Sequence, residues 1–285
     1  MDPAAAPDGA TRPARVVIYR HSRIVRVTHW INLLVISLLL MSGLQIFNAH
    51  PSLYWGQSGA DFDPPLLALR AVGVGTGHPV GVTWIAGHAW RTTGLFGVSA
   101  GADGQTAVQG IPRWATLPSW RDLAAGRRWH FFLAWVFVLN GLIYLLAGLL
   151  NGHFRRDLAP TRAQLRPGHI LQDIWDHIRL RHPVGEAAKS YNVLQKFAYL
   201  AVVFLLLPAM VATGLTMSPG IDAAAPWLLT LFGGRQSART VHFISANLIV
   251  LFVLVHVVEV VIAGAFNEIG SMITGWYAVR TEPAE

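Results

Sequence analysis

Long apolar runs alternate along this chain with polar connections that are rich in glycine and proline. Four runs stay apolar for about 20 residues, the length that a helix needs to cross a bilayer. They cover residues 27–47, 129–150, 192–216 and 237–264. A proline has no backbone N–H for a helix interior, so we expect a kink at Pro208 in the third run. The pattern predicts an all-α integral membrane protein, a four-helix bundle.

The connection between the first two runs, residues 48–128, has no span of its own. It contains many glycines and prolines and five of the tryptophans. A structureless loop of this length is rare unless it is functional. We expect short helices that lie on the membrane surface, with the tryptophans at the level of the lipid headgroups. We expect such a segment to serve either as a docking surface for another protein or as a lid.

These runs divide the chain into one membrane domain and two tails. The domain covers residues 27–265, including a second connection at 151–191. Residues 1–26 and 266–285 are expected to be tails, and the first 15 residues, rich in alanine and proline, to be disordered. The first run is too long for the core of a signal peptide and no cleavage site is evident, so it counts as a span.

Basic residues flank the spans unevenly. Five precede the first span, eight lie within residues 151–196, and only Arg235 and Arg239 lie in the turn before the fourth span. Basic residues stay on the cytoplasmic side, whereas long connections cross the membrane largely regardless of their charge. Both termini are therefore predicted to be cytoplasmic. The 48–128 loop is then outside, in the periplasm if this is a cell inner membrane.

The composition narrows the chemistry. Hydrophobic residues make up 53% of the chain and charged residues 13%, unlike an ordinary soluble domain. There is no cysteine, which excludes disulfides, iron-sulfur clusters, thiolate-ligated haem and covalently attached haem. The net charge of +7 comes from residues that flank apolar spans, so it indicates orientation in a membrane and not nucleic-acid binding.

The fourth run contains two histidines, His242 and His256. Fourteen helical steps bring the second ring to within about 40° of the first and separate the two by roughly 21 Å along the axis. A single histidine in such a helix is commonly just a hydrogen-bonded residue. Two on one stripe, at two depths of the membrane, favour a functional site. Haem ligation is the chemistry that needs imidazoles placed in this way.

Two more histidines complete the pattern. His29 begins the first span at its cytoplasmic end, and His130 begins the second span at its outer end. With the predicted orientation, His130 and His242 lie at the outer level and His29 and His256 at the inner level. We therefore predict two six-coordinate haem irons, each with two axial imidazoles.

The other eight histidines lie outside the spans, and we expect them on the surface. They are His21, His50, His78, His88, His153, His169, His177 and His182. If one of the four predicted ligands is wrong, His21 and His153 are the alternatives.

Arginines and glycines accompany the predicted ligands. Arg26, Arg127 and Arg239 each stand three residues before one of them, on a neighbouring position of the same helical face. Guanidinium groups there suit haem propionates, although basic residues also flank many membrane helices. Gly43 lies on the helical face of His29, and Gly148 lies on the helical face of His130. Each glycine is near the level of the haem that its own histidine does not bind. A missing side chain admits a macrocycle, and it also suits close helix contacts.

The order and spacing of these histidines resemble the prokaryotic cytochrome b561 family, four-helix di-haem membrane cytochromes b. This family includes the cytochrome b subunits of nickel-iron hydrogenases, formate dehydrogenases and thiosulfate reductases. The segments GRRWHFF at 126–132 and GGRQSAR at 233–239 resemble members that accompany a molybdopterin oxidoreductase. The resemblance implies two haems b and electron transfer between a periplasmic redox subunit and the quinone pool. It therefore implies an electron-transfer subunit and not a complete enzyme.

Two functions of other classes stay open. A standalone oxidase of a small diffusible reductant, such as superoxide, would use the same haems and deliver electrons to quinone without a partner. A haem-free membrane anchor would need neither the paired histidines nor the arginines. Turnover without a partner distinguishes the first, and absence of a haem b spectrum would indicate the second.

Glu259 is the acidic residue within the fourth span, three positions after His256. It lies one helical turn nearer the predicted cytoplasmic face than that histidine. Burial favours its neutral form, which suits a proton donor or a hydrogen-bond partner to a quinone carbonyl. We predict a quinone site there, at the inner level. The alternatives are that Glu259 reaches the interface, that it pairs with a basic residue of the inner connection, or that quinone binds at the outer haem.

Overall fold

The computed structural model of the protein describes residues 15–60, 63–179, 181 and 190–280. His182 and all but the last residue of the predicted disordered segment lie outside these ranges. Within them, four helices are long and apolar enough to cross a membrane: α1 (Arg23–Phe47), α2 (Leu123–Leu150), Val193–Thr216 and α8 (Arg235–Thr274). The prediction of four spans is confirmed in number and order.

Helices α1 and α2 begin earlier than the hydropathy pattern suggests because polar side chains cap them. At the start of α1, Ser22 Oγ accepts a hydrogen bond from the N–H of Val25 at 3.4 Å. At the start of α2, Asp122 Oδ1 accepts one from the N–H of Ala125 at 2.9 Å. Each cap satisfies a backbone donor that the first helical turn leaves free, so the helix extends into the polar segment.

The third span consists of three pieces, α4 (Val193–Ala201), a π-helical turn (Val202–Leu206) and α5 (Leu207–Thr216). Pro208 lies two residues after the π-helical turn, and a proline clashes with the carbonyl four residues before it, here within that turn. The wider turn accommodates this irregularity, where a kink was predicted. Short helices α6 (Pro219–Ala224) and α7 (Pro226–Leu231) then lead to α8.

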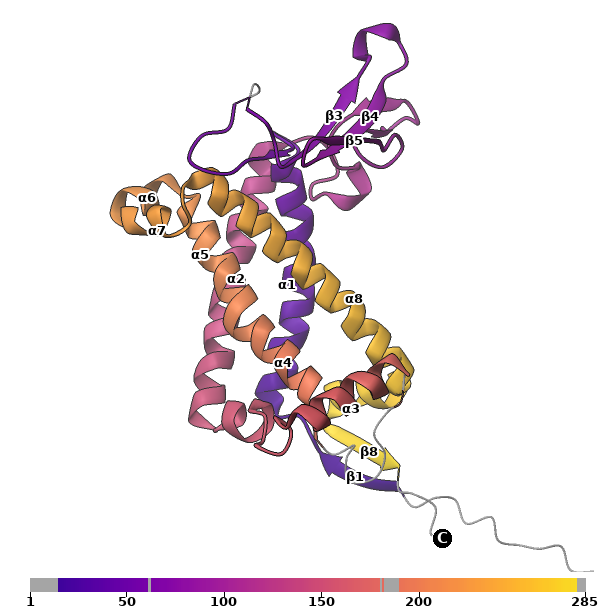
Figure 1. The fold of residues 1–285 in the computed structure, drawn as a ribbon, viewed down its shortest axis with the longest axis vertical. Helices are drawn as coiled ribbons and strands as arrows, with labels where there is room; N and C mark the ends of the chain where they lie inside the picture. The colour runs from indigo at the N-terminus through magenta and orange to yellow at the C-terminus, as the bar shows by residue number, and fades with distance from the viewer. Residues whose placement is uncertain (1–14, 61–62, 180, 182–189, 281–285) are drawn as a thin grey trace, which may run out of the picture. The chain divides into compact units, whose positions relative to one another are not determined.

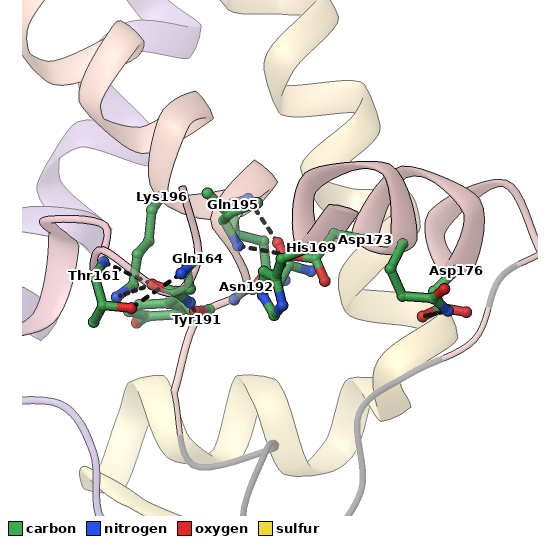
Figure 2. Close-up of polar contacts among 11 residues, drawn as sticks. Thr161, Gln164, His169, Asp173, Asp176, Tyr191, Asn192, Gln195 and Lys196 are labelled. Carbon is green, nitrogen blue, oxygen red and sulfur yellow. Dashed lines mark hydrogen bonds and ion pairs between the residues drawn. The ribbon is translucent and has the colours of Figure 1, made fainter. Parts of the chain in front are cut away.

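A capping box fixes the start of α4 (Figure 2). Asn192 Oδ1 accepts a hydrogen bond from the N–H of Gln195 at 2.8 Å, and Gln195 Oε1 accepts one from the N–H of Asn192 at 3.3 Å. One turn further on, the buried Lys196 donates from Nζ to Ala159 O and to Gln164 Oε1, both at 3.1 Å. A lysine near the end of a span is thus satisfied by neutral oxygens.

The chain forms two compact units. One contains residues 28–145 and 201–252, and the other contains the described parts of 1–27, 146–200 and 253–285. Each of α1, α2 and α8 contributes to both units.

In the first unit, the connection between α1 and α2 folds as β-structure (Figure 1). A four-stranded antiparallel sheet has the order β2-β3-β4-β5, and β6 pairs with β7. The strands are β2 (Ser52–Leu53), β3 (Leu67–Val72), β4 (Val80–Ile85), β5 (His88–Arg91), β6 (Val98–Ala100) and β7 (Thr106–Val108). Two short 3₁₀-helices, η1 (Val74–Thr76) and η2 (Arg113–Ala115), complete the segment. The prediction of surface helices was therefore wrong, and the fold is not purely α-helical.

Local chemistry explains these strands. Valine, threonine and tryptophan are frequent in β4, and such residues pack well on a pleated surface. The turn between β4 and β5 has positive φ at Ala86 (48°) and Gly87 (84°), as a two-residue hairpin requires. Gly97 packs so closely that a Cβ there would lie 2.1 Å from Arg70 O. The polar residues that interrupt the apolar pattern of this connection exclude a membrane span. They are compatible with strands that have one face exposed.

Two apolar clusters hold this unit together. Buried Val35 of α1 packs with Leu133 and Phe137 of α2. At the loop end of α1, Phe47 packs with Leu53 and Ile111 of the connecting segment and with Leu69 of β3. The sheet is therefore fixed to the ends of the helices by its own apolar core.

In the second unit, the segments predicted as tails are partly ordered. Strands β1 (Arg15–Tyr19) and β8 (Trp276–Arg280) pair antiparallel, with Ile18 opposite Tyr277 (Figure 1). The connection after α2 contains a π-helical turn (Phe154–Leu158) and the helix α3 (Pro167–Ile178).

Candidate haem sites

The structure brings His130 of α2 and His242 of α8 together in the first unit. Their ring centroids are 6.3 Å apart and the rings are inclined by 63°. An imidazole nitrogen binds a metal at about 2.0 Å, so two axial imidazoles on one iron have centroids roughly 6 Å apart. The separation therefore fits a pair of axial ligands.

A hydroxyl group orients each of these rings. Ser42 Oγ of α1 lies 3.1 Å from His130 Nδ1 and donates its own hydrogen to Leu38 O at 2.8 Å. Leu39 O, which can only accept, lies 3.2 Å from the same Nδ1. This nitrogen therefore carries the proton, and Nε2 of His130 has a lone pair that could bind a metal.

The arrangement at His242 is the same in kind. Thr213 Oγ1 of α5 lies 2.9 Å from His242 Nδ1 and donates to Ala209 O at 2.6 Å. With its hydrogen used, the hydroxyl accepts the Nδ1–H of the histidine, and Nε2 again carries the free lone pair. An outer-shell partner of this kind holds a ligating histidine in one tautomer and one orientation.

A glycine follows each of these hydroxyl residues. A Cβ on Gly43 would lie 3.3 Å from His130 Cε1, and a Cβ on Gly214 would lie 3.6 Å from His242 Cε1. The sequences Ser42-Gly43-Leu44 and Thr213-Gly214-Leu215 therefore form two equivalent seats, each for one imidazole. Gly43 lies beside His130, and its contact with a macrocycle stays a prediction.

Polar groups lie next to this pair at the end of α8. Arg239 donates from Nη1 to Ser52 O at 2.8 Å and from Nη2 to His50 O, which ties the segment after α1 to α8. Tyr54 is 1% exposed, and its hydroxyl has no hydrogen-bond partner among the described residues. A buried hydroxyl without a partner is costly. A haem propionate would supply the missing acceptor, so the residues present fit the group.

The other two predicted cations differ in their surroundings. Arg127 is exposed, and its guanidinium lies over the ring of Phe131 at 5.5 Å. Arg26 donates from Nη1 to Ile273 O in the second unit, while its buried Nε has no hydrogen-bond partner among the described residues. Roles for both with haem propionates stay predictions.

The inner pair is divided between the units. His29 belongs to the first unit and His256 to the second, and their pairing stays a prediction. Beside His29, the buried Asn140 of α2 donates from Nδ2 to Thr28 O at 2.9 Å and to Asn32 Oδ1 at 2.8 Å. This amide joins α1 and α2 within the span, where backbone and side-chain polar groups need partners.

Gly148 and the alternative ligand His153 lie close together in the chain. A Cβ on Gly148 would lie 2.4 Å from Cζ of Phe154, so the ring of Phe154 lies on this glycine. Its predicted contact with a haem stays a prediction. His153 Nδ1 lies 2.7 Å from Asp157 Oδ2, so this histidine takes part in an ion pair with its own turn.

Glu259 contacts a histidine of α3. Glu259 Oε1 lies 3.3 Å from His177 Nε2, and the two side chains are 21% and 32% exposed. His177 was expected on the surface, and the alternative in which Glu259 pairs with a basic residue of the inner connection describes this contact.

Several residues of these sites were not predicted. Ser42, Thr213 and Gly214 carry a signal in the repeated hydroxyl-glycine-leucine triplet, which is too short to interpret without the histidines beside it. Tyr54, Asn140 and His177 carry no comparable signal, because their roles depend on contacts between distant segments.

Paired imidazoles with oriented Nε2 atoms, on helices that span a membrane, define a membrane cytochrome. The chain matches the family model for prokaryotic cytochrome b561 over residues 20–275. It belongs to that family. It is accordingly a multi-pass membrane protein of a family that binds haem b and transfers electrons.

Two relatives are similar over much of the chain. The putative protein-methionine-sulfoxide reductase subunit YedZ1 of Azospira oryzae is 28% identical over 241 residues, 84% of this chain and 89% of that protein. The probable Ni/Fe-hydrogenase B-type cytochrome subunit of Cupriavidus necator is 26% identical over 160 residues, 52% of this chain and 65% of that protein. No solved structure matches.

Proposed function

We propose that this protein transfers electrons between a periplasmic redox subunit and the membrane quinone pool through two haems b. His130 with His242 would hold one haem, and His29 with His256 the other. A haem b supplies one-electron chemistry between ferric and ferrous iron. The observation that carries the proposal is the pair of seats at His130 and His242, in which hydroxyl groups fix both Nδ1–H tautomers.

The proposed orientation has both termini in the cytoplasm of a bacterium and the chain in the cell inner membrane. The distribution of basic residues supports it, because residues 12–26 hold five and residues 151–196 hold eight of the 22 lysines and arginines. The sheet between α1 and α2 then faces the periplasm. Arg239, Arg127 and Tyr54 would bind propionates of the outer haem, and Arg26 those of the inner haem.

The periplasmic sheet is the proposed docking surface for the redox subunit. Trp114 is 75% exposed, and Trp55, Trp90 and Trp120 are exposed as well. Exposed aromatic residues are typical of protein interfaces. Both relatives are named as subunits of oxidoreductases, which supports a partner of that kind, such as a molybdopterin oxidoreductase.

Alanine at Trp90 and Trp114 tests this docking surface. The variant should keep both haems and lose most of its reduction by the partner, while alanine at Trp135, exposed on α2 within the span, serves as the control. Reduction at the wild-type rate would favour a lid over the outer haem.

The haem assignment is tested by redox titration of four alanine variants. His130→Ala and His242→Ala should remove the same potential component, and His29→Ala and His256→Ala the other. If His29→Ala and His242→Ala removed the same component, the pairing would be wrong.

Two other results would indicate a different function. Absence of a haem b spectrum in the wild-type protein would indicate a haem-free membrane anchor. Quinone reduction by a small reductant such as superoxide, without a partner, would indicate a standalone oxidase.

A further inference from the structure

Helix α3 (Pro167–Ile178) presents two different faces. Leu171, Ile174, Trp175 and Ile178 follow the i, i+3, i+4, i+7 spacing of one helical stripe and all are exposed, up to 67% at Ile178. The residues on the opposite side are polar. An exposed apolar stripe of this kind is typical of a helix that lies in the plane of a membrane surface.

The polar face of α3 is held by the ends of two spans in the same unit. Asp173 Oδ2 accepts a hydrogen bond from the N–H of Val193, the first residue of α4, at 3.0 Å. His177 lies 3.3 Å from Glu259 of α8. Figure 2 shows His169 and Asp173 turned toward the start of α4. These contacts set α3 at the depth where the spans leave the membrane, with its apolar stripe turned away from them.

A second segment of this unit has the same character. Gly264 breaks α8 with φ 114°, and the helix then continues to Thr274. Phe266 is 99% exposed, with Ile269 and Ile273 on the same stripe also exposed. On the other side, Asn267 Oδ1 accepts the N–H of Ala278 at 3.1 Å, and its Nδ2 donates to Ala278 O at 2.9 Å. Helix α3 and the segment 265–274 of this unit therefore each have an exposed apolar stripe close to the end of a span.

Cations accompany the stripe of α3. Arg162 and Arg166 are exposed just before the helix, and the guanidinium of Arg179, just after it, lies over the ring of Trp175 at 4.3 Å. Tryptophan and arginine together are typical anchors at the level of lipid headgroups. Arginines near a membrane surface attract anionic lipids.

We propose that α3 is an in-plane helix that inserts its apolar stripe into the lipid leaflet, with Arg162, Arg166 and Arg179 bound to anionic headgroups. The segment 265–274 extends the same lipid-binding surface. The occupant is the bilayer that the chain itself spans, because the contacts with Val193 and Glu259 place the stripe at its boundary. This inference is independent of the partner, of the quinone and of which side faces the cytoplasm.

The absence of cysteine from the sequence allows a direct test. Single variants Leu171→Cys, Ile178→Cys and Gln172→Cys are labelled with a fluorophore in the full-length protein, reconstituted in nanodiscs of phosphatidylcholine and phosphatidylglycerol. Gln172 is an exposed polar residue about 100° around the same helix from Leu171, outside the apolar stripe, so it is the matched control. Brominated lipids should quench the labels at 171 and 178, and a water-soluble quencher should reach only the label at 172.

Two outcomes would overturn the proposal. Equal quenching of all three labels from water would place the stripe in solvent. Protection of 171 and 178 from both quenchers would mean that protein, a second copy or another subunit, covers it. An unchanged haem spectrum in each variant shows that the fold is intact.

The charge component is tested by native mass spectrometry of bound lipid. The double variant Arg162→Gln/Arg166→Gln should lower the preference for phosphatidylglycerol over phosphatidylcholine, by roughly fivefold for each arginine. Arg70→Gln/Arg91→Gln, the same charge change on the sheet, should leave the preference unchanged. An equal loss in both double variants would mean that net charge, and not α3, recruits the lipid.

Discussion

Each outer histidine is held by a hydroxyl group from a neighbouring helix. Ser42 and Thr213 donate their own hydrogens to carbonyls of their helices, so they accept the Nδ1–H of His130 and His242. This contact does two things at once: it selects the tautomer, and it satisfies a polar group within the membrane, where water does not reach. The hydroxyl residues are therefore as much a part of the candidate haem site as the two histidines.

Removal of either hydroxyl should weaken the site without abolishing it. Ser42→Ala and Thr213→Val are expected to lower haem affinity by about 10- to 100-fold, as loss of an outer-shell partner commonly does. Titration of the purified apoprotein with haem measures this. Ser37→Ala and Thr216→Val are matched controls, because those hydroxyls bond only to carbonyls of their own helices. Equal effects in the controls would assign the loss to helix stability.

Tyr54 should act on the haem and not on the fold. Its buried hydroxyl has no partner among the described residues, so Tyr54→Phe is expected to leave the apoprotein as stable or slightly more stable. If the hydroxyl donates to a propionate, the variant shifts the potential of the outer haem component in a redox titration. An unchanged potential together with unchanged haem affinity would remove Tyr54 from the site.

The proximity of His130 and His242 could be predicted from the sequence, whereas the hydroxyl groups beside them could not. It follows from helix direction and from the position of each residue in its span, and the role of the two histidines as haem ligands stays a prediction. Ser42 and Thr213 lie 88 and 29 residues from the histidines that they contact, and only the packing of helices brings them close. Pairing of His29 with His256 stays a prediction.

At the scale of elements, apolar length predicted the spans well because a bilayer imposes that length. Apolar length did not predict the structure of the 48–128 connection. Its strands are short and half-exposed, so the alternation of apolar and polar residues along them is weak. Their order depends on pairing between distant segments, as between Leu69 and Thr83. The ends of the spans were missed because capping by Ser22 and Asp122 is set by single polar residues.

The turn after α2 gives a pH-dependent contribution to stability. Burial alone would raise the pKa of Asp157, but hydrogen bonds from His153 and Arg156 outweigh it, so the net pKa is lowered. A carboxyl whose pKa is lower in the folded state contributes stability above its unfolded pKa, about 3.9. This contribution is lost as the pH falls through the folded value.

Asp157→Asn should therefore lower the melting temperature of the detergent-solubilised protein at neutral pH and have less effect in acid. Melting curves measured from neutral pH to below about pH 4 would show the two proteins converging. Asp103→Asn, at an exposed loop position, is the control. A constant difference at every pH would mean that the ion pair with His153 is not the cause.

At the scale of the whole molecule, electrons that enter from the periplasmic sheet would reach the outer level first, and the inner level is the proposed exit. Quinone reduction consumes protons, and Glu259 is the acidic residue of α8 nearest to His256 in sequence. Its contact with His177, which is 32% exposed, joins this carboxyl to a group that water reaches. This geometry supports a proton route, and equally a structural link between α3 and α8.

Glu259→Gln and His177→Gln distinguish these two roles. If Glu259 serves the quinone, the first variant keeps both haems and their reduction, while reoxidation by a quinone analogue slows; the second variant slows it in a way that depends on pH. If the contact is only structural, both variants lower the melting temperature alike and reoxidation keeps its rate. Glu268→Gln, later in α8, is the matched control for charge. A quinone analogue bound beside His130 would place the site at the outer level.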